Sequence, residues 1–454
     1  MHCECINDVC VPFPNDFARK SFNRLPTTTE WARFRKYARR MRELNQIPGV
    51  LSPEVFSVLQ PHTTNDDPFL PNLNVLCLSL IGASFLPFIS LFLSPRITSI
   101  FLMFHGSNHF KAMVASTVKI LPTLCPNLQA ITLLRLPRDP MITAAVSEML
   151  LATSRNTLQK FRVDSPLTKE ASEVVYRLPN LCNLLVVIEG ESSLSSASLP
   201  NLTTLEIVCD NEGGWPGLFH GATFGNLESV TFSHRSEGIG SFLEIFKRAA
   251  LFSSVQNTLS KFCLSTSCSW NPNYPSLLPF TQLVDLEIQF LCVGECSSRV
   301  DDDIVIDLSQ AMPKLRVLKL GGEPCGEPTT GVTAKGLVAL ALYCPDLSYL
   351  CIHFQVVSLS VPLANPGITR NAEPTGSWTG CDLRELVVGE IPAPESVLRV
   401  ALTLLQIFPQ IESIYSDRDG WGEVEDAIRD SRRIVGYSSK HPLNGLEVTL
   451  MTPL

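Results

Sequence analysis

A short phrase that recurs along the chain constrains its fold more than any other feature. At residues 71–78 it reads Pro-Asn-Leu-x-x-Leu-x-Leu, and it returns with small changes as far as residue 411. The copies are separated on average by about 28 residues, and such a period is typical of stacked structural units. The thirteen copies begin at the apolar residues Leu73, Ile97, Leu128, Leu158, Leu181, Leu202, Leu227, Leu259, Leu283, Leu315, Leu347, Leu383 and Ile411.

Each copy predicts one β-strand, and a helix between strands. The last two apolar residues of the phrase are two positions apart, which places them on one face of a strand and the residue between them on the other. Several copies begin after a proline. Because the residue before proline is driven out of the helical region, the preceding helix must end there. Apolar residues at helical spacing predict helices at Ile142–Met149, Phe242–Ala250, Leu337–Tyr343 and Val397–Phe408.

The units must stack, because none of them can bury its own apolar edge. Their period is that of leucine-rich repeats, and the Cys-Pro-x-Leu steps at Cys125 and Cys344 resemble the cysteine-containing class of these repeats. The sequence therefore predicts an α/β leucine-rich-repeat solenoid (a horseshoe) over residues 70–415. We expect parallel strands on its concave face and helices on its convex face.

The two ends of the chain differ from the repeats. We predict an amphipathic capping helix in the region 30–60, with Thr29 as its N-cap. Its many arginines are also compatible with a surface that binds RNA or membrane. We expect residues 1–29 to be a disordered or remnant segment. The C-terminal segment 416–454 is predicted to cap the last repeat, with three apolar side chains packed inward: Trp421, Val424 and Ile428.

The N-terminal helix carries a second resemblance. A helix with this aromatic and apolar spacing, directly before leucine-rich repeats, resembles the segment that follows the F-box in fungal F-box proteins. The resemblance implies a substrate-recognition subunit that docks through its N-terminus onto the linker subunit of a cullin–RING ubiquitin ligase. Residues 1–29 lack the Leu-Pro opening and the long apolar helix of an F-box, so we expect the F-box itself to be missing or truncated. The residues that carry the resemblance are Trp31, Phe34, Tyr37, Ala38, Arg39, Met41 and Leu44.

Composition excludes several classes of protein. Hydrophobic residues make up 45% of the chain and charged residues 18%, which excludes an intrinsically disordered protein. A net charge of −8 excludes a nucleic-acid binder that works by bulk charge.

The 15 cysteines are scattered, and residues 1–16 lack a signal peptide, so we predict reduced thiols and a cytoplasmic or nuclear location. The uncharged stretch 68–95 could cross a bilayer, but Pro87 and the repeat phrase favour a buried strand and helix.

Motifs for catalysis or cofactor binding are missing. No phosphate loop, nucleophile elbow or His-Glu-x-x-His occurs, and Gly238-x-Gly240 lacks the third glycine of a dinucleotide fingerprint. We predict a solvated loop, rather than a calcium site, at residues 301–303. The remaining potential ligands lack the spacing of a metal site, and we predict no metal and no cofactor. They are His2, Cys3, Cys5 and Cys10, the pair His105 and His109, and the pair Cys292 and Cys296.

These features predict a non-enzymatic protein that binds a protein target on its concave face, with no nucleic-acid or membrane partner. Function as an F-box-like ligase subunit is the first reading. A stand-alone leucine-rich-repeat scaffold or inhibitor without a link to ubiquitin is the alternative, and an enzyme would need a titratable cluster on the concave face. The candidate partner-binding residues on that face are Thr132, Glu206, Thr231, Glu287, Arg316, Lys319 and Cys351.

Overall fold

A computed structural model of the chain forms two compact units, Met1–Val187 (unit 1) and Ile188–Leu454 (unit 2). The predicted helix at Phe242–Ala250 lies outside the residues that the structure describes. The described residues are 5–6, 9–10, 24, 26–46, 53–62, 68–105, 110–153, 157–188, 198–209, 223–234, 255–267, 274–291, 300–321, 331–355, 381–389, 394, 396–416 and 419–435.

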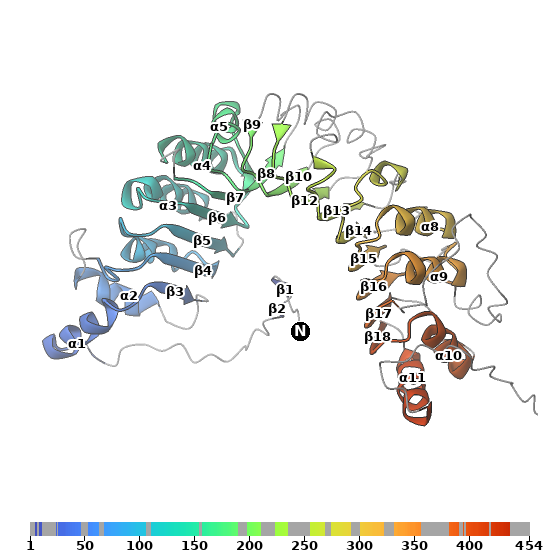
Figure 1. Cartoon of the computed structure of the whole chain (residues 1–454). Helices are drawn as coiled ribbons and strands as arrows, with labels where there is room; N and C mark the ends of the chain where they lie inside the picture. Colours follow the sequence, from blue (N-terminus) through green and yellow to red (C-terminus); the bar gives the residue numbers. More distant parts are fainter. Residues whose placement is uncertain are drawn as a thin grey trace, which may run out of the picture. The chain divides into compact units, whose positions relative to one another are not determined.

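Fourteen strands form one sheet in the order in which they occur along the chain (Figure 1). Every described pairing between neighbours in this sheet is parallel. The prediction of an α/β solenoid built from parallel-strand repeats is thereby confirmed. The strands are β3 (Glu43–Gln46), β4 (Val75–Ile81), β5 (Ser99–Phe104), β6 (Ala130–Leu134), β7 (Lys160–Pro166), β8 (Asn183–Ile188), β10 (Thr204–Cys209), β12 (Ser229–His234), β13 (Lys261–Ser267), β14 (Asp285–Leu291), β15 (Val317–Leu320), β16 (Tyr349–Ile352), β17 (Glu385–Gly389) and β18 (Ser413–Ser416).

Every copy of the phrase forms a strand, which begins two residues after the first apolar residue of that copy. Equivalent positions of neighbouring copies pair with one another, as Leu76 does with Ile100 and Ile131 with Phe161. The side chains of these four residues are at most 1% exposed. The repeated leucines therefore form a continuous apolar layer under the sheet in each unit, as the period of two requires.

Helices lie along one side of the strands in each unit (Figure 1). Four of them have as C-cap the residue before the proline of the phrase, namely Cys125, Met312, Cys344 and Phe408. Each cap has left the helical region, with φ near −120° and ψ between 65° and 80°. The helices are α1 (Thr28–Ala38), α2 (Pro53–Leu59), α3 (Lys111–Leu124), α4 (Pro140–Ala152), α5 (Lys169–Val175), α8 (Asp302–Ala311), α9 (Ala334–Tyr343), α10 (Val397–Ile407) and α11 (Trp421–Val435), with 3-10 turns η1 (Gln60–His62), η2 (Leu86–Phe92) and η4 (Tyr274–Leu277).

Two short strand pairs lie outside the long sheet. Strands β1 (Cys5–Ile6) and β2 (Val9–Cys10) are antiparallel, and β9 (Ser198–Leu199) pairs in parallel with β11 (Thr223–Phe224). Both Leu199 and Phe224 are 1% exposed, so the second pair contributes to the core of unit 2.

The N-terminal helix is shorter than predicted, and the prediction of Thr29 as its N-cap is wrong. Helix α1 is capped by Thr27, whose hydroxyl accepts from the Glu30 N–H while the Glu30 carboxylate accepts from the Thr27 N–H. The helix ends at Ala38, and β3 follows, with Leu44 paired to Leu76 of β4. The sheet thus begins one strand before the first predicted copy.

The uncharged stretch 68–95 is part of the core of unit 1. It forms β4 and the 3-10 turn η2, in which Ile89 is fully buried. A strand and a helix were predicted here, and the helix is of the 3-10 type. Of the helices in the described residues, none has the length and apolar character to cross a membrane.

The C-terminal helix α11 buries the residues expected to face inward. Trp421, Val424 and Ile428 are between 0% and 3% exposed, and the Trp421 ring contacts that of Phe354 edge-on at 6.1 Å. The charged residues occupy the rest of the helix, where Arg429 pairs with both Glu425 and Asp426. This amphipathic division agrees with the predicted packing.

The prediction of a solvated loop at residues 301–303 is wrong, because these aspartates begin helix α8. Asp301 is its N-cap and accepts from the Ile304 N–H at 3.0 Å. Asp302 reaches the start of the next helix, α9, where its carboxylate accepts from the N–H groups of Thr333 and Gly336. Short acidic side chains are favoured at helix starts because they satisfy amides that have no partner within the helix.

Candidate functional site

The candidate site is the face of the sheet opposite the helices. The third residue of each strand from β3 to β18 points away from the buried leucines, and we call these residues the central row. Within each unit, parallel register places each of them beside its equivalent in the next strand. In unit 1 the central row is Asn45, Cys77, Phe101, Thr132, Arg162 and Leu185. In unit 2 it is Glu206, Thr231, Cys263, Glu287, Lys319, Cys351, Val387 and Tyr415.

The two units differ in how much of this row they offer to a partner. In unit 1, Thr132 is 4% and Leu185 is 3% exposed, so their side chains have little accessible surface. In unit 2 all row residues are partly or well exposed, and Tyr415 reaches 53%. The row of unit 2 is therefore the better candidate for a binding surface.

Five of the seven predicted residues come together in the row of unit 2, and they are Glu206, Thr231, Glu287, Lys319 and Cys351. The other two lie elsewhere. Thr132 belongs to the row of unit 1. Arg316 precedes β15 by one residue, where its side chain is exposed and its carbonyl accepts from the N–H groups of Ser348 and Tyr349. No contact brings Arg316 into the row among the described interactions.

A group of charged residues, which we call the charged cluster, extends over β13–β16. Lys261 bonds Asp285 at 2.6 Å, and Lys319 lies 3.4 Å from Glu287. The ammonium group of Lys319 also lies 5.4 Å from the centre of the Tyr349 ring, which is cation–π geometry. Gln289 donates to Glu287 within the same strand. The cluster is therefore pre-ordered by its own contacts, two cations facing two anions.

The electrostatics favour the charged form of Lys261. The hydrogen bond from Lys261 to Asp285 raises the pKa of the lysine. The second carboxylate oxygen of Asp285, Oδ1, is shielded from solvent and accepts no hydrogen bond from the described residues. A shielded acceptor of this kind is costly, since a buried carboxylate oxygen normally has a donor.

Two of the row cysteines, Cys263 and Cys77, have raised thiol pKa values. Burial raises the pKa of Cys263 to about 12, and the nearby Glu287 carboxylate adds to the shift. Burial also raises the pKa of Cys77. A thiol with a raised pKa is a poor nucleophile and packs as a small hydrophobic group. These two side chains thus contribute packing to the face rather than reactivity.

Sequence reasoning missed two of the four charged residues of the cluster, Lys261 and Asp285, and the neighbouring Tyr349. These residues occupy the first position of their strands, directly before the second apolar residue of the phrase. First and third positions share a face, since side chains alternate along a strand. Applying the period of two to both positions, rather than to the residue between the last two leucines alone, finds them.

The weaker candidates for metal ligands do not come together in the described part of the chain. There, no three side chains of His, Cys, Asp or Glu are placed to hold a metal ion. His105 is exposed after β5. Side chains of the remaining candidates lie outside the described residues, and these are His2, Cys3, Cys5, Cys10, His109, Cys292 and Cys296.

Comparison with known proteins gives little for this chain. No protein-family model and no curated protein matches it. A solved structure of a protein from Bacteroides fragilis is similar, with a TM-score of 0.32 and 12% sequence identity, over 57% of this chain and 67% of that chain. At a TM-score this low, the likeness carries no argument about fold or function.

Proposed function

We propose that this chain is a non-enzymatic protein-binding repeat protein whose target docks on the helix-free face of unit 2. The observation that carries the proposal is the charged cluster, whose two ion pairs are ordered by their own contacts and remain partly exposed. Parallel strands hold these side chains in fixed register, so a partner meets a surface that is already ordered. Such pre-organisation reduces the entropy lost on binding.

The chemistry of the cluster supports a protein target of mixed polarity. Two cations, on β13 and β15, flank two anions on β14, and this arrangement favours a partner with complementary charges rather than a polyanion such as nucleic acid. Tyr349 and Tyr415 add aromatic surface, and tyrosine is enriched among residues that dominate binding energy. The same face offers hydrogen-bonding groups along at least eight strands of unit 2.

The test is a charge reversal on each side of the sheet. Lys319→Glu disrupts the cluster, whereas Lys335→Glu makes the same change on helix α9, where the side chain is 53% exposed. The full chain and both variants serve as bait, and the partners that co-purify are quantified by mass spectrometry. We expect the first variant alone to lose a specific partner, with unchanged thermal midpoints. Equal partner sets for all three chains contradict the proposal.

We further propose that the target is passed to a cullin–RING ubiquitin ligase, with docking of the linker subunit through the N-terminal region. Support comes from the resemblance of the α1 region to the helix that follows the F-box. Removing residues 1–23 leaves Arg24 and the Thr27 cap in place, so α1 keeps its start. If the ligase proposal holds, this deletion abolishes binding of the purified linker subunit. Target binding that persists without any binding of the linker subunit supports the stand-alone scaffold or inhibitor instead.

Location in the cytoplasm or nucleus is part of the same proposal. Support comes from eight described cysteines, which are reduced thiols rather than members of disulfides. Four of these eight are buried. Reduced buried thiols are typical of proteins in a reducing compartment. Fractionation of cells that express the full chain tests this location.

A further inference from the structure

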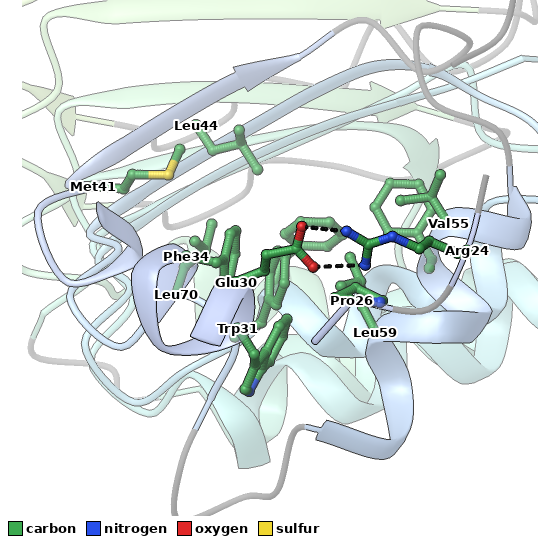
Figure 2. A pocket seen from close by; sticks show the side chains of 13 residues that line it. Arg24, Pro26, Glu30, Trp31, Phe34, Met41, Leu44, Val55, Leu59 and Leu70 are labelled. Atoms are coloured by element: carbon green, nitrogen blue, oxygen red, sulfur yellow. Dashed lines mark hydrogen bonds and ion pairs between the residues drawn. The ribbon is translucent and has the colours of Figure 1, made fainter. Parts of the chain in front are cut away.

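A pocket of about 600 Å³ lies in unit 1, between α1, β3, α2 and η2 (Figure 2). Its walls are almost entirely apolar. Five aromatic rings contribute, and they come from Trp31 and Phe34 of α1, Phe56 of α2, Phe69, and Phe92 of η2. The volume is within the range of about 300–1,000 Å³ that is typical of pockets for small molecules.

The rings form a continuous wall. Phe34 is stacked with Trp31, at 5.0 Å, and with Phe69, at 4.8 Å between ring centres, and Trp31 and Phe69 lie 6.4 Å apart, so the three rings form one cluster. Phe92 meets both Phe69 and Phe56 edge-on at 5.7 Å. A wall of stacked and edge-on rings offers flat surfaces and ring edges, which favour another flat aromatic group over a branched aliphatic one.

The pocket exists because the sheet ends there. Leu76 in β4 is fully buried, but its register partner Leu44 in β3 is only partly buried, because β3 is the last strand of the sheet at this end. The side chains of Leu44 and Met41 line the pocket. Apolar surface that the next repeat covers elsewhere is here left for α1 to cover, and α1 covers it incompletely.

Polar groups in the pocket lining are few, and they are charged. The Arg24 guanidinium donates one hydrogen bond to each carboxylate oxygen of Glu30, with N–O distances of 2.8 and 2.7 Å (Figure 2). Glu30 also accepts from the N–H and hydroxyl of Thr27, as part of the α1 cap. A second guanidinium, that of Arg35, lies 5.7 Å from the centre of the Trp31 ring. Two cations therefore lie at the pocket, Arg35 of α1 and Arg24 before the helix, and Arg24 holds the one carboxylate that the described residues contribute to the lining.

We propose that this pocket binds a flat aromatic ligand that carries one carboxylate, which replaces Glu30 on the guanidinium of Arg24. The aromatic rings of the ligand lie against Phe34 and Phe69. Its carboxylate forms the same bidentate contact with Arg24 that Glu30 makes in the unbound chain. The exchange keeps Arg24 paired. Released Glu30 keeps its acceptor role toward Thr27, so the cap of α1 survives. The cations of α1 add long-range attraction for an anion.

Fluorescence titration of the full chain with 1-pyrenebutyrate tests the proposal, with the uncharged 1-pyrenebutanol as the matched probe. We expect a Kd on the order of 10 µM for the carboxylate and binding of the alcohol that is about tenfold weaker or more. Equal affinity for the two probes, or no saturable binding of the carboxylate, overturns the proposal.

Substitutions of Glu30 and of Arg24 should change the affinity for the carboxylate probe in opposite directions. Glu30→Gln keeps an oxygen that can accept from Thr27 but removes the competing charge, so the carboxylate should bind about threefold to tenfold more tightly. Arg24→Gln should weaken it by about tenfold or more. Arg33→Gln, on the same helix but outside the pocket lining, is the control; it removes only screened long-range attraction and should change the affinity by about twofold or less. A Glu30→Gln variant that binds more weakly contradicts the exchange.

A third substitution fills the pocket. Leu44→Trp adds a ring at the partly open side, and it should abolish binding of both probes while the thermal midpoint stays unchanged. Should this variant fail to fold, the two ion-pair variants still decide the matter, because neither changes the apolar walls. Undiminished binding to a folded Leu44→Trp variant places the probe elsewhere and refutes the assignment.

Discussion

The link from Asp302 to the next repeat makes a sharp prediction for stability. Its Oδ1 accepts from the N–H groups of Thr333 and Gly336 at 2.8 and 2.9 Å, and its Oδ2 accepts from the Thr333 hydroxyl at 2.6 Å. Each such bond is partly buried, and a typical net value is about 1 kcal/mol. Asp302→Ala should therefore lower the free energy of unfolding by about 2–3 kcal/mol.

A neighbouring aspartate supplies the matched control. Asp303 is also in the first turn of α8, but its side chain is 88% exposed and 3.7 Å from Lys335. Asp303→Ala changes helix propensity and helix-end charge in the same way, and should alter stability by about 0.5 kcal/mol or less. Urea unfolding measures both values. Hydrogen exchange at the Thr333 and Gly336 amides should accelerate only in Asp302→Ala.

Gly336 lies against the same carboxylate and tests the geometry. Alanine in a helix is ordinarily more stable than glycine by about 1 kcal/mol. Here a Cβ on Gly336 would lie 2.6 Å from Asp302 Oδ1, so Gly336→Ala should destabilise the native chain. With Asp302→Ala already present, the contact with Oδ1 is gone and a milder one with Val332 Cγ1, at 3.2 Å, remains, so the same change should be clearly less destabilising. A stabilising Gly336→Ala in the native background, or additive effects of the two changes, would refute this reasoning.

Three further predictions concern thiols, acid and the core. Burial raises the pKa of Cys344 and Cys381 to about 12, so both should react with iodoacetamide at pH 8 about a thousandfold more slowly than in urea, as mass spectrometry can show. These pKa values exceed those of the unfolded chain, so stability should fall as the pH rises above about 9. Hydrogen bonds from Arg24 and then Thr27 lower the pKa of Glu30 to about 2. The stabilisation of α1 by the charged Glu30 is therefore complete above about pH 4.5 and should be lost as the pH falls toward 2. Circular dichroism should show this as a loss of helical signal that the Glu30→Gln variant lacks. Leu350→Ala removes a fully buried side chain and should cost about 2–5 kcal/mol, whereas Leu398→Ala, at a site 60% exposed, should cost about 0.5 kcal/mol or less in the same urea assay.

The fold was predictable because one spacing rule applies to every unit. The thirteen copies of the phrase correspond to thirteen strands, and the prolines locate helix ends such as Cys125 and Cys344. The rule failed where a unit departs from it. In β3, Gln46 replaces the last apolar residue of the phrase, so Met41 and Leu44 fitted a helical stripe equally well.

The candidate site was predictable only in part. Glu287 and Lys319 follow from alternation along a strand, but their pairing depends on a register that joins residues 32 positions apart. The aspartates at 301–303 resembled a polar loop because their partners, Thr333 and Gly336, lie about 30 residues further along. The pocket in unit 1 combines segments between Arg24 and Phe92, and no single stretch of sequence displays it.

One-to-one pairing of equivalent positions has an evolutionary consequence. Because an outward residue such as Thr231 touches its row neighbours while the adjacent Phe232 fills the interior, recognition can drift by point substitution without cost to folding. Duplication of one genetic segment of about 28 codons would lengthen the surface by one strand spacing, about 4.8 Å. Specificity in such a protein can diverge quickly while its architecture is inherited unchanged.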